Sequence, residues 1–127
     1  MNILLAEDDP NISTIAKLAL EQIGGHKVTH VDNGEKALKL ILEQGSDFDV
    51  ILLDEMMPGL NGVRVCQEYL KAVSTPQPVI FLSAKSQSSD IKEFLELGKG
   101  FIPKPFDPMQ LNPLIENILN KTETHAA

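Results

Sequence analysis

Five short apolar runs, each followed by a segment with helical spacing, constrain the fold of this chain more than any other feature. The apolar runs are residues 2–6, 26–31, 49–53, 78–82 and 100–102, and the helical segments are 10–23, 33–43, 62–72, 89–97 and 107–120. Short, nearly continuous apolar runs are typical of strands that are buried on both faces. Strands that alternate with helices predict a parallel sheet covered by helices on both sides. We therefore predict an α/β fold of one domain over residues 1–121, with a short flexible tail at 122–127.

The composition narrows the classes of protein that this chain can belong to. It has 127 residues, of which 43% are apolar, and a formal net charge of -7. This apolar share is sufficient for a packed core and argues against intrinsic disorder. An acidic domain is a poor ligand for nucleic acid, which needs clustered Lys and Arg. No apolar run is long enough to cross a bilayer, so we expect a cytoplasmic protein with neither a membrane nor a nucleic-acid partner.

The single cysteine and the histidines give no sign of a redox or metal centre. Cys66 lies in the apolar stripe of a predicted helix, which favours a place in the core. One cysteine also rules out an internal disulfide. His26, His30 and His125 are scattered along the chain, and we interpret them as surface or structural residues.

Acidic residues follow two of the predicted strands. Glu7 and Asp8 come directly after the first strand, and Asp54 follows the third. Ligands of open parallel sheets bind beyond the carboxyl ends of the strands. If the first and third strands are neighbours, these three carboxylates converge and repel one another. A divalent cation would relieve that repulsion, and an all-oxygen ligand set favours Mg²⁺, or Mn²⁺, over Zn²⁺.

Two further polar residues stand at later strand ends. Ser83 follows the fourth strand and Lys104 follows the fifth, so they offer a hydroxyl and a compact positive charge at the same edge. A carboxylate beside Mg²⁺, a hydroxyl and an ammonium group has the parts needed to accept a phosphoryl group. Each residue alone has an ordinary structural explanation. Their occurrence at successive strand ends favours the functional interpretation.

Asp9 has a simpler role than its acidic neighbours. It precedes Pro10 at the start of a predicted helix, which is the pattern of an N-cap residue followed by proline at the first helical position. We therefore predict that Asp9 caps this helix.

The chain resembles the response-regulator receiver family of two-component phosphorelays from Asn2 to about Asn120. The segments that carry the resemblance are Ile3–Asp9 (ILLAEDD), Leu52–Gly62 (LLDEMMPGLNG), Phe81–Ala84 (FLSA) and Lys104–Phe106 (KPF). The Met-Pro-Gly-x-x-Gly pattern after a strand-end Asp is especially specific. The resemblance implies a flavodoxin-like (βα)5 fold with strand order 2-1-3-4-5 and helices on both faces of the sheet.

The resemblance also implies a metal-binding role for four residues. Asp54 would be the phosphoacceptor and a metal ligand, and Asp8 would be a direct ligand. Glu7 would act through water, and Met56 would bind through its backbone carbonyl. Mg²⁺ would be the usual ion, with Mn²⁺ as a substitute.

The remaining roles implied by the resemblance concern phosphate binding and switching. Ser83 would be the switch hydroxyl, Lys104 the phosphate-binding lysine and Phe101 the switch aromatic. The Lys104–Pro105 peptide bond would be cis. Met56 and Lys85 occupy positions that tune the dephosphorylation rate in the family.

The function implied is that of a phosphorylation-switched signalling domain. A sensor histidine kinase or a histidine phosphotransfer protein would donate the phosphoryl group from a phosphohistidine. The domain would assist its own phosphorylation and slow autodephosphorylation, without turning over an external substrate. Its output face, formed by the fourth helix, fifth strand and fifth helix, would bind a protein target that the sequence does not identify. A monomer and a phosphorylation-dependent dimer both fit.

Three other functions are open to a chain with this pattern. A pseudo-receiver would be a phosphorylation-independent binding module, but such proteins usually lose one of the acidic pair, the acceptor or the lysine. An aspartyl-phosphate phosphatase would carry a second Asp where this chain has Met56. A flavin-binding protein would need a phosphate-cradling loop after the first strand, where this chain is acidic. The start at Met1 and the short polar tail favour a stand-alone receiver over a piece of a longer regulator.

Overall fold

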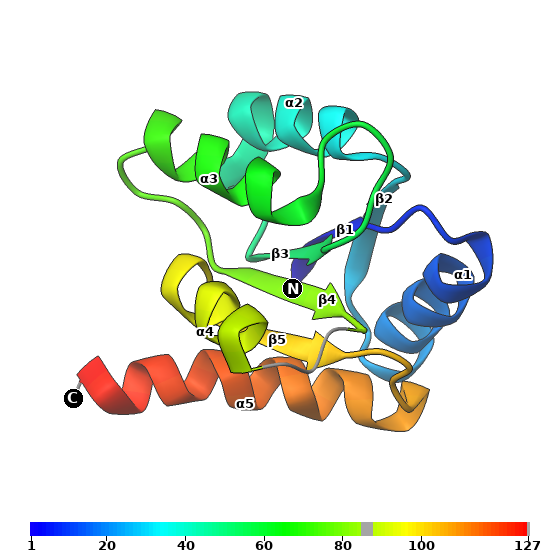
Figure 1. Cartoon of the computed structure of the whole chain (residues 1–127). Helices are drawn as coiled ribbons and strands as arrows, with labels where there is room; N and C mark the ends of the chain where they lie inside the picture. Colours follow the sequence, from blue (N-terminus) through cyan, green and yellow to red (C-terminus); the bar gives the residue numbers. More distant parts are fainter. Residues whose placement is uncertain (85–87, 127) are drawn as a thin grey trace.

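Five parallel strands form a single sheet in the computed structural model of this chain (Figure 1). The strands lie in the order β2-β1-β3-β4-β5, which confirms the flavodoxin-like arrangement that the resemblance implies. Their bounds, within one residue of the predicted ones, are β1 Asn2–Ala6, β2 Lys27–Val31, β3 Val50–Asp54, β4 Val79–Ser83 and β5 Gly100–Pro103. Each neighbouring pair is parallel.

Helices cover both faces of the sheet, as predicted, and each face has its own apolar core. The helices are α1 Pro10–Leu18, α2 Gly34–Gln44, α3 Gly62–Ala72, α4 Ser88–Leu97 and α5 Pro108–Ala126, with short turns η1 Ala19–Ile23 and η2 Gly45–Asp47. Alternate residues of β1 face opposite cores: Leu4 packs with residues of α2, α3 and α4, whereas Leu5 packs with residues of α1 and α5. Figure 1 shows α2 and α3 above the sheet and α5 below it.

The structure describes residues 1–84 and 88–126, and the side chains of 121–127 and of Ser88 are not described. Lys85 and the side chain of His125, both considered above, therefore lie outside the described residues. Within the described part of the chain, no helix is both long and apolar enough to span a membrane. Helix α5 continues past its predicted end at Asn120 to Ala126.

The predicted helix at residues 10–23 is not one regular helix. Its last turn, η1, is a π-helix in which the Gly24 N–H donates to the Ala19 carbonyl, five residues earlier. The same carbonyl accepts a second hydrogen bond, 3.1 Å long, from the buried Asn112 side chain on α5. A methyl group at Gly24 would overlap the Asn112 side chain, so a larger residue at this position would displace the side chain that donates to Ala19.

The loop between β3 and α3 is held tightly at both of its ends. Asn61 caps α3 by accepting a hydrogen bond from the Arg64 N–H at 2.9 Å. A methyl group at Gly62 would overlap the backbone carbonyl of Asp54, and one at Gly34 would overlap that of Leu60. This close backbone approach fixes the end of β3, where the side chain of Asp54 begins.

We predict that Gly62→Ala destabilises the protein by about 2 kcal/mol or more, because the added methyl group pushes α3 away from β3. Gly45→Ala is the matched control, since its methyl group would meet no backbone atom and its nearest neighbour would be the Tyr69 hydroxyl, at 3.2 Å. Urea unfolding followed by circular dichroism measures both variants. Equal stabilities of the two variants would contradict the proposed clamp.

Cys66 lies in the core, as predicted. Its side chain is fully buried, and burial raises the pKa of the thiol to about 12. Its Sγ lies 3.8 Å from the Leu97 carbonyl, so the thiol contacts α4 from α3. Both the burial and the high pKa suppress formation of the reactive thiolate.

We therefore predict that Cys66 does not react with a chromogenic disulfide reagent at about pH 8 until the protein is unfolded, because its thiolate is neither accessible nor populated. Absorbance measured with and without denaturant gives the number of reacting thiols. Rapid labelling of the native protein, at a rate close to that of the denatured chain, would show that the α3–α4 contact opens readily.

Candidate functional site

A pocket of about 230 Å³ lies at the carboxyl ends of the strands and brings together most of the predicted site residues. The strand order explains this, because β1 and β4 flank β3, and β5 pairs with β4. The residues that line the pocket are Glu7, Asp8, Asp9, Ile12, Asp54, Glu55, Met56, Ser83, Ala84 and Lys104. All six residues predicted for metal or phosphate binding are in this set.

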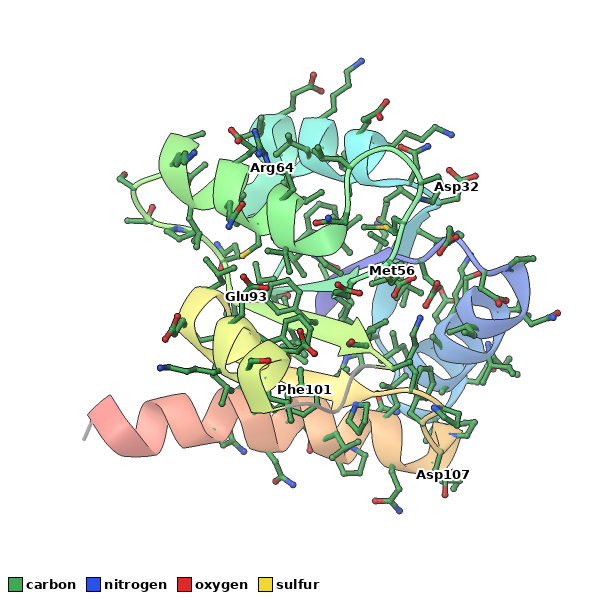
Figure 2. All side chains as sticks on the ribbon, viewed as in Figure 1. Asp32, Met56, Arg64, Glu93, Phe101 and Asp107 are labelled. Atoms are coloured by element: carbon green, nitrogen blue, oxygen red, sulfur yellow. The ribbon has the colours of Figure 1, made fainter. Side chains whose placement is uncertain are left out.

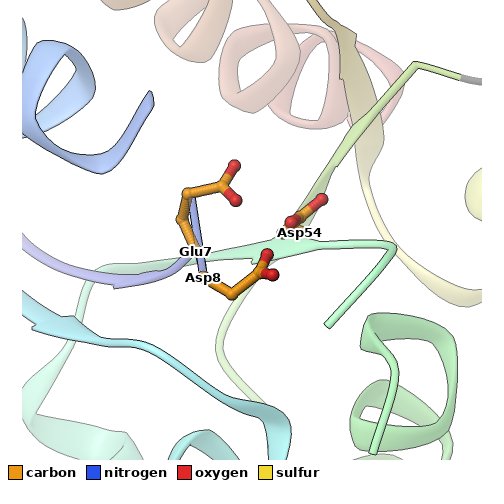
Figure 3. A group of neighbouring side chains, drawn as sticks. All are labelled: Glu7, Asp8 and Asp54. Carbon is orange, nitrogen blue, oxygen red and sulfur yellow. The ribbon is translucent and has the colours of Figure 1, made fainter. Parts of the chain in front are cut away.

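Three carboxylates converge at the centre of the pocket. Glu7, Asp8 and Asp54 each offer an oxygen, and these oxygens lie within 4.8 Å of one another. Figure 3 shows the three side chains pointing toward one another from the ends of β1 and β3. Glu7 and Asp54 are buried, whereas Asp8 is exposed. The group therefore has two fixed inner carboxylates and one that faces solvent.

Lys104 joins the two inner carboxylates. Its Nζ lies 2.9 Å from Asp54 Oδ1 and 3.0 Å from Glu7 Oε1. Burial by itself would lower the pKa of Lys104, but the hydrogen bonds to Asp54 and Glu7 outweigh burial and raise it. The lysine is therefore held in its charged form, and its ammonium group crosses from the β5 end of the sheet to β1 and β3.

The charge in the pocket is not balanced by this lysine. Burial and, after it, the neighbouring Glu7 raise the pKa of Asp54, whereas Lys104 lowers it, and the net result is a pKa of about 6. One ammonium group faces three carboxylates in the cluster. The donor set consists of oxygens, and a divalent cation would supply the missing positive charge. The residues present therefore fit Mg²⁺.

Asp9 caps α1, which confirms the predicted role. Its Oδ1 accepts hydrogen bonds from the Asn11 N–H at 2.8 Å and the Ile12 N–H at 3.2 Å. The Asp9 N–H in turn donates to Glu7 Oε2 at 3.2 Å. Asp9 thus caps the start of α1 with its side chain and restrains the Glu7 carboxylate with its backbone N–H.

Ser83 and Lys104 are linked through the backbone. Ser83 is buried at the end of β4, and its carbonyl accepts a hydrogen bond of 2.9 Å from the Lys104 N–H. The peptide bond between Lys104 and Pro105 is cis. Met56 lies at the other side of the pocket, where its N–H is 3.4 Å from Asp54 Oδ1 and its side chain is exposed.

Phe101, the predicted switch aromatic, does not line the pocket. It is half-buried on β5 and packs against Phe94 of α4, with ring centroids 5.9 Å apart. Phe94 in turn packs against Phe81 of β4 at 5.0 Å. Figure 2 shows Phe101 beside α4 and Met56 in the loop after β3. The three rings thus form a continuous contact from β4, which ends at Ser83, through α4 to β5.

Two residues at the site had no functional role in the sequence analysis. Glu55 is 6% exposed and lines the pocket, and its only signal in the sequence is its position directly after Asp54. His30, which we interpreted as a surface or structural residue, places its Nε2 2.8 Å from the backbone carbonyl of Glu7. Its sequence signal is its place near the end of β2, next to the strand that ends at the acidic residues.

The fold and the pocket together define a small α/β domain with an acidic pocket at the carboxyl ends of its parallel strands. The sequence profile of the response regulator receiver domain matches residues 3–116. The chain therefore belongs to the response regulator receiver family, the receiver domains of two-component systems.

Individual relatives agree with this assignment. A probable transcriptional regulator, ycf27, from Cyanidium caldarium is 37% identical over 127 residues, which cover 99% of this chain and 49% of the relative. The alkaline phosphatase synthesis transcriptional regulatory protein PhoP from Bacillus subtilis is 34% identical, with 98% and 50% covered. The receiver domain of the Francisella response regulator 1452 is 31% identical with a TM-score of 0.83, and 95% and 98% are covered. The chain spans about half the length of the two curated transcriptional regulators.

We predict that Asp54→Asn stabilises the metal-free protein by about 1–3 kcal/mol above pH 6, because it removes a buried carboxylate that is costly to ionise. A carboxyl whose pKa is raised on folding from 3.8 to about 6 holds its proton more tightly in the folded state. The wild type therefore loses stability as pH rises from about 4 to about 6. The advantage of the variant should shrink as pH falls through that interval.

Urea unfolding in EDTA at about pH 4.5 and about pH 7.5 measures this difference. Glu93→Gln, at an exposed position on α4, removes the same charge from the surface and serves as the control. A pH-independent gain at Asp54 would show that its carboxylate is not strained in the folded protein.

Proposed function

We propose that this receiver domain accepts a phosphoryl group on Asp54 from a phosphohistidine donor, in a reaction that requires Mg²⁺. The observation that carries the proposal is the contact of Lys104 with Asp54 and Glu7, beside Asp8, in one pocket. A buried acceptor carboxylate, two flanking carboxylates and a fixed ammonium group are the parts that phosphoryl transfer requires. Membership of the family supports the same assignment.

The acceptor carboxylate is the nucleophile in this proposal. An Asp54 oxygen attacks the phosphorus atom, the P–N bond of the donor breaks, and the leaving imidazole nitrogen keeps the electron pair. The product is an acyl phosphate on Asp54 and a histidine on the donor. Asp54 must be ionised to attack. With a pKa of about 6, most of this carboxyl group is ionised at neutral pH.

Positive charge next to the reacting phosphoryl group would come from two sources, a bound cation and Lys104. Asp8, Asp54 and the Met56 carbonyl would bind Mg²⁺ directly and Glu7 through water. The bound ion would neutralise phosphoryl oxygens and their developing charge. Lys104 already lies 2.9 Å from Asp54 Oδ1, so its ammonium group is in position to pair with a phosphoryl oxygen there. Mn²⁺ has the same preference for oxygen ligands and could replace Mg²⁺.

Ser83 and Phe101 would convert the new phosphate into a change of shape. Ser83 lines the pocket from the end of β4, where its hydroxyl can donate to a phosphoryl oxygen. Phe101 contacts Phe94 on α4, so a rotation of its ring would change the face formed by α4, β5 and α5. A bistable element biased by a new charge is a general mode of switching.

The partners proposed here are those that membership of the receiver family implies. The donor would be a sensor histidine kinase or a histidine phosphotransfer protein, and a protein target would bind the changed face. The domain would catalyse only its own phosphorylation and slow autodephosphorylation. It would act as a monomer or as a phosphorylation-dependent dimer. The alternative is a pseudo-receiver, in which the pocket is structural and binding does not depend on phosphate.

We predict that acetyl phosphate with Mg²⁺ adds one phosphoryl group to the protein, because the pocket supplies the acceptor carboxylate, the lysine and the ligands for Mg²⁺. Intact mass spectrometry measures the addition. Asp54→Ala and EDTA should abolish it, and Asp8→Asn should raise the Mg²⁺ concentration required, while Asp32→Asn on the exposed surface should have no effect. An unmodified wild type, folded and also unable to bind beryllofluoride, would identify a pseudo-receiver.

A further inference from the structure

The side chain of His30 reaches the backbone of the acidic loop from the edge strand β2. Its Nε2 lies 2.8 Å from the carbonyl oxygen of Glu7, in a partly buried contact. A carbonyl only accepts hydrogen bonds, so Nε2 must carry the proton and donate. In the neutral ring, this contact therefore selects the tautomer with the proton on Nε2.

This hydrogen bond lies where the backbone ladder between β1 and β2 ends. The last registered pair is Ala6 with Val31, and the Glu7 N–H still donates to the Val31 carbonyl at 3.1 Å. The Glu7 carbonyl lies one step further along the chain. At this step the β2 chain turns toward the N-cap of α2, at Asn33. The His30 side chain supplies a donor at this point.

The peptide that accepts this bond joins two of the carboxylate residues. Glu7 precedes it and Asp8 follows it, and both side chains point into the pocket. The Asp9 N–H holds the Glu7 carboxylate at 3.2 Å, and Lys104 holds it at 3.0 Å from the other side. None of these contacts holds the peptide plane between Glu7 and Asp8. The His30 hydrogen bond restrains that plane, and with it the direction in which the exposed Asp8 side chain leaves the backbone.

We propose that His30 is a positioning residue for the cation site, acting through the Glu7–Asp8 peptide. It touches neither the cation nor the phosphoryl group. Its effect is to hold Asp8 in the orientation that completes the set of oxygen ligands. This inference rests on the proposed Mg²⁺-dependent function of the pocket. Outer residues that orient metal ligands in this way commonly affect metal affinity without changing the ligands themselves.

The test compares Mg²⁺ affinities of the full chain, measured by NMR titration of backbone amides. His30→Leu removes the donor and keeps much of the bulk, and we expect it to weaken Mg²⁺ binding about 2- to 10-fold, the effect of one hydrogen bond. His30→Gln places an amide donor near the same position and should recover most of the affinity. Thr29→Val, at the adjacent exposed position of β2, is the control and should leave the affinity unchanged.

A second readout separates positioning from chemistry. In phosphorylation by acetyl phosphate, His30→Leu should raise the Mg²⁺ concentration at half-maximal rate and leave the rate at saturating Mg²⁺ unchanged. Equal Mg²⁺ affinities for His30→Leu and the wild type would overturn the inference and leave the proposed function standing. A wild type that shows no Mg²⁺-dependent shift would overturn both.

The ring itself provides a measurement that needs no variant. Nitrogen NMR of the wild type, above the pKa of histidine, should show the neutral tautomer with the proton on Nε2. A proton on Nδ1 would leave no donor for the Glu7 carbonyl and would overturn the inference, even where His30→Leu fails to fold.

Discussion

The bridge from Lys104 to Asp54 and Glu7 is the interaction on which the rest of the site depends. It joins residues 50 and 97 positions apart, so it exists only when β1, β3 and β5 are all in place. Glu7 and Asp54 are buried, and a buried carboxylate without a partner is strongly destabilising. The lysine offsets part of that cost, and the sheet order makes the offset possible.

The scaffold that holds this bridge is rigid at the points where the acidic residues leave it. The central strands β3 and β4 are buried throughout, and close contacts at Gly62 and Gly34 fix the loop after β3. The loop after β1 is restrained by the Asp9 cap and by the contact with His30. Binding sites that must hold charges at fixed distances are most accurate when built on such supported ends of strands.

The strands and the polar residues at the strand ends could be predicted from the sequence, because each follows from local pattern. A continuous apolar run such as Val50–Leu53 indicates a buried strand, and the polar residues at strand ends mark the ligand edge. The strand order came from the resemblance, since hydrophobic pattern alone does not select it. The π-helix at Ala19–Ile23 could not be predicted, because it depends on Asn112, 93 residues away in the sequence. The Lys104–Glu7 pair and the His30 contact were missed for the same reason.

The electrostatics of the pocket give the proposed reaction an order of events. Three carboxylates and one ammonium group leave the metal-free pocket negative, and burial together with the neighbouring Glu7 raises the pKa of Asp54. A phosphoryl donor is also an anion, so it would approach a repulsive site. Under the proposed function, cation binding must therefore come first, because it converts the pocket from one that repels phosphate to one that attracts it. The electrostatic repulsion among the carboxylates of the metal-free pocket is then part of the proposed mechanism, because a pocket that was already neutral would bind the cation less strongly.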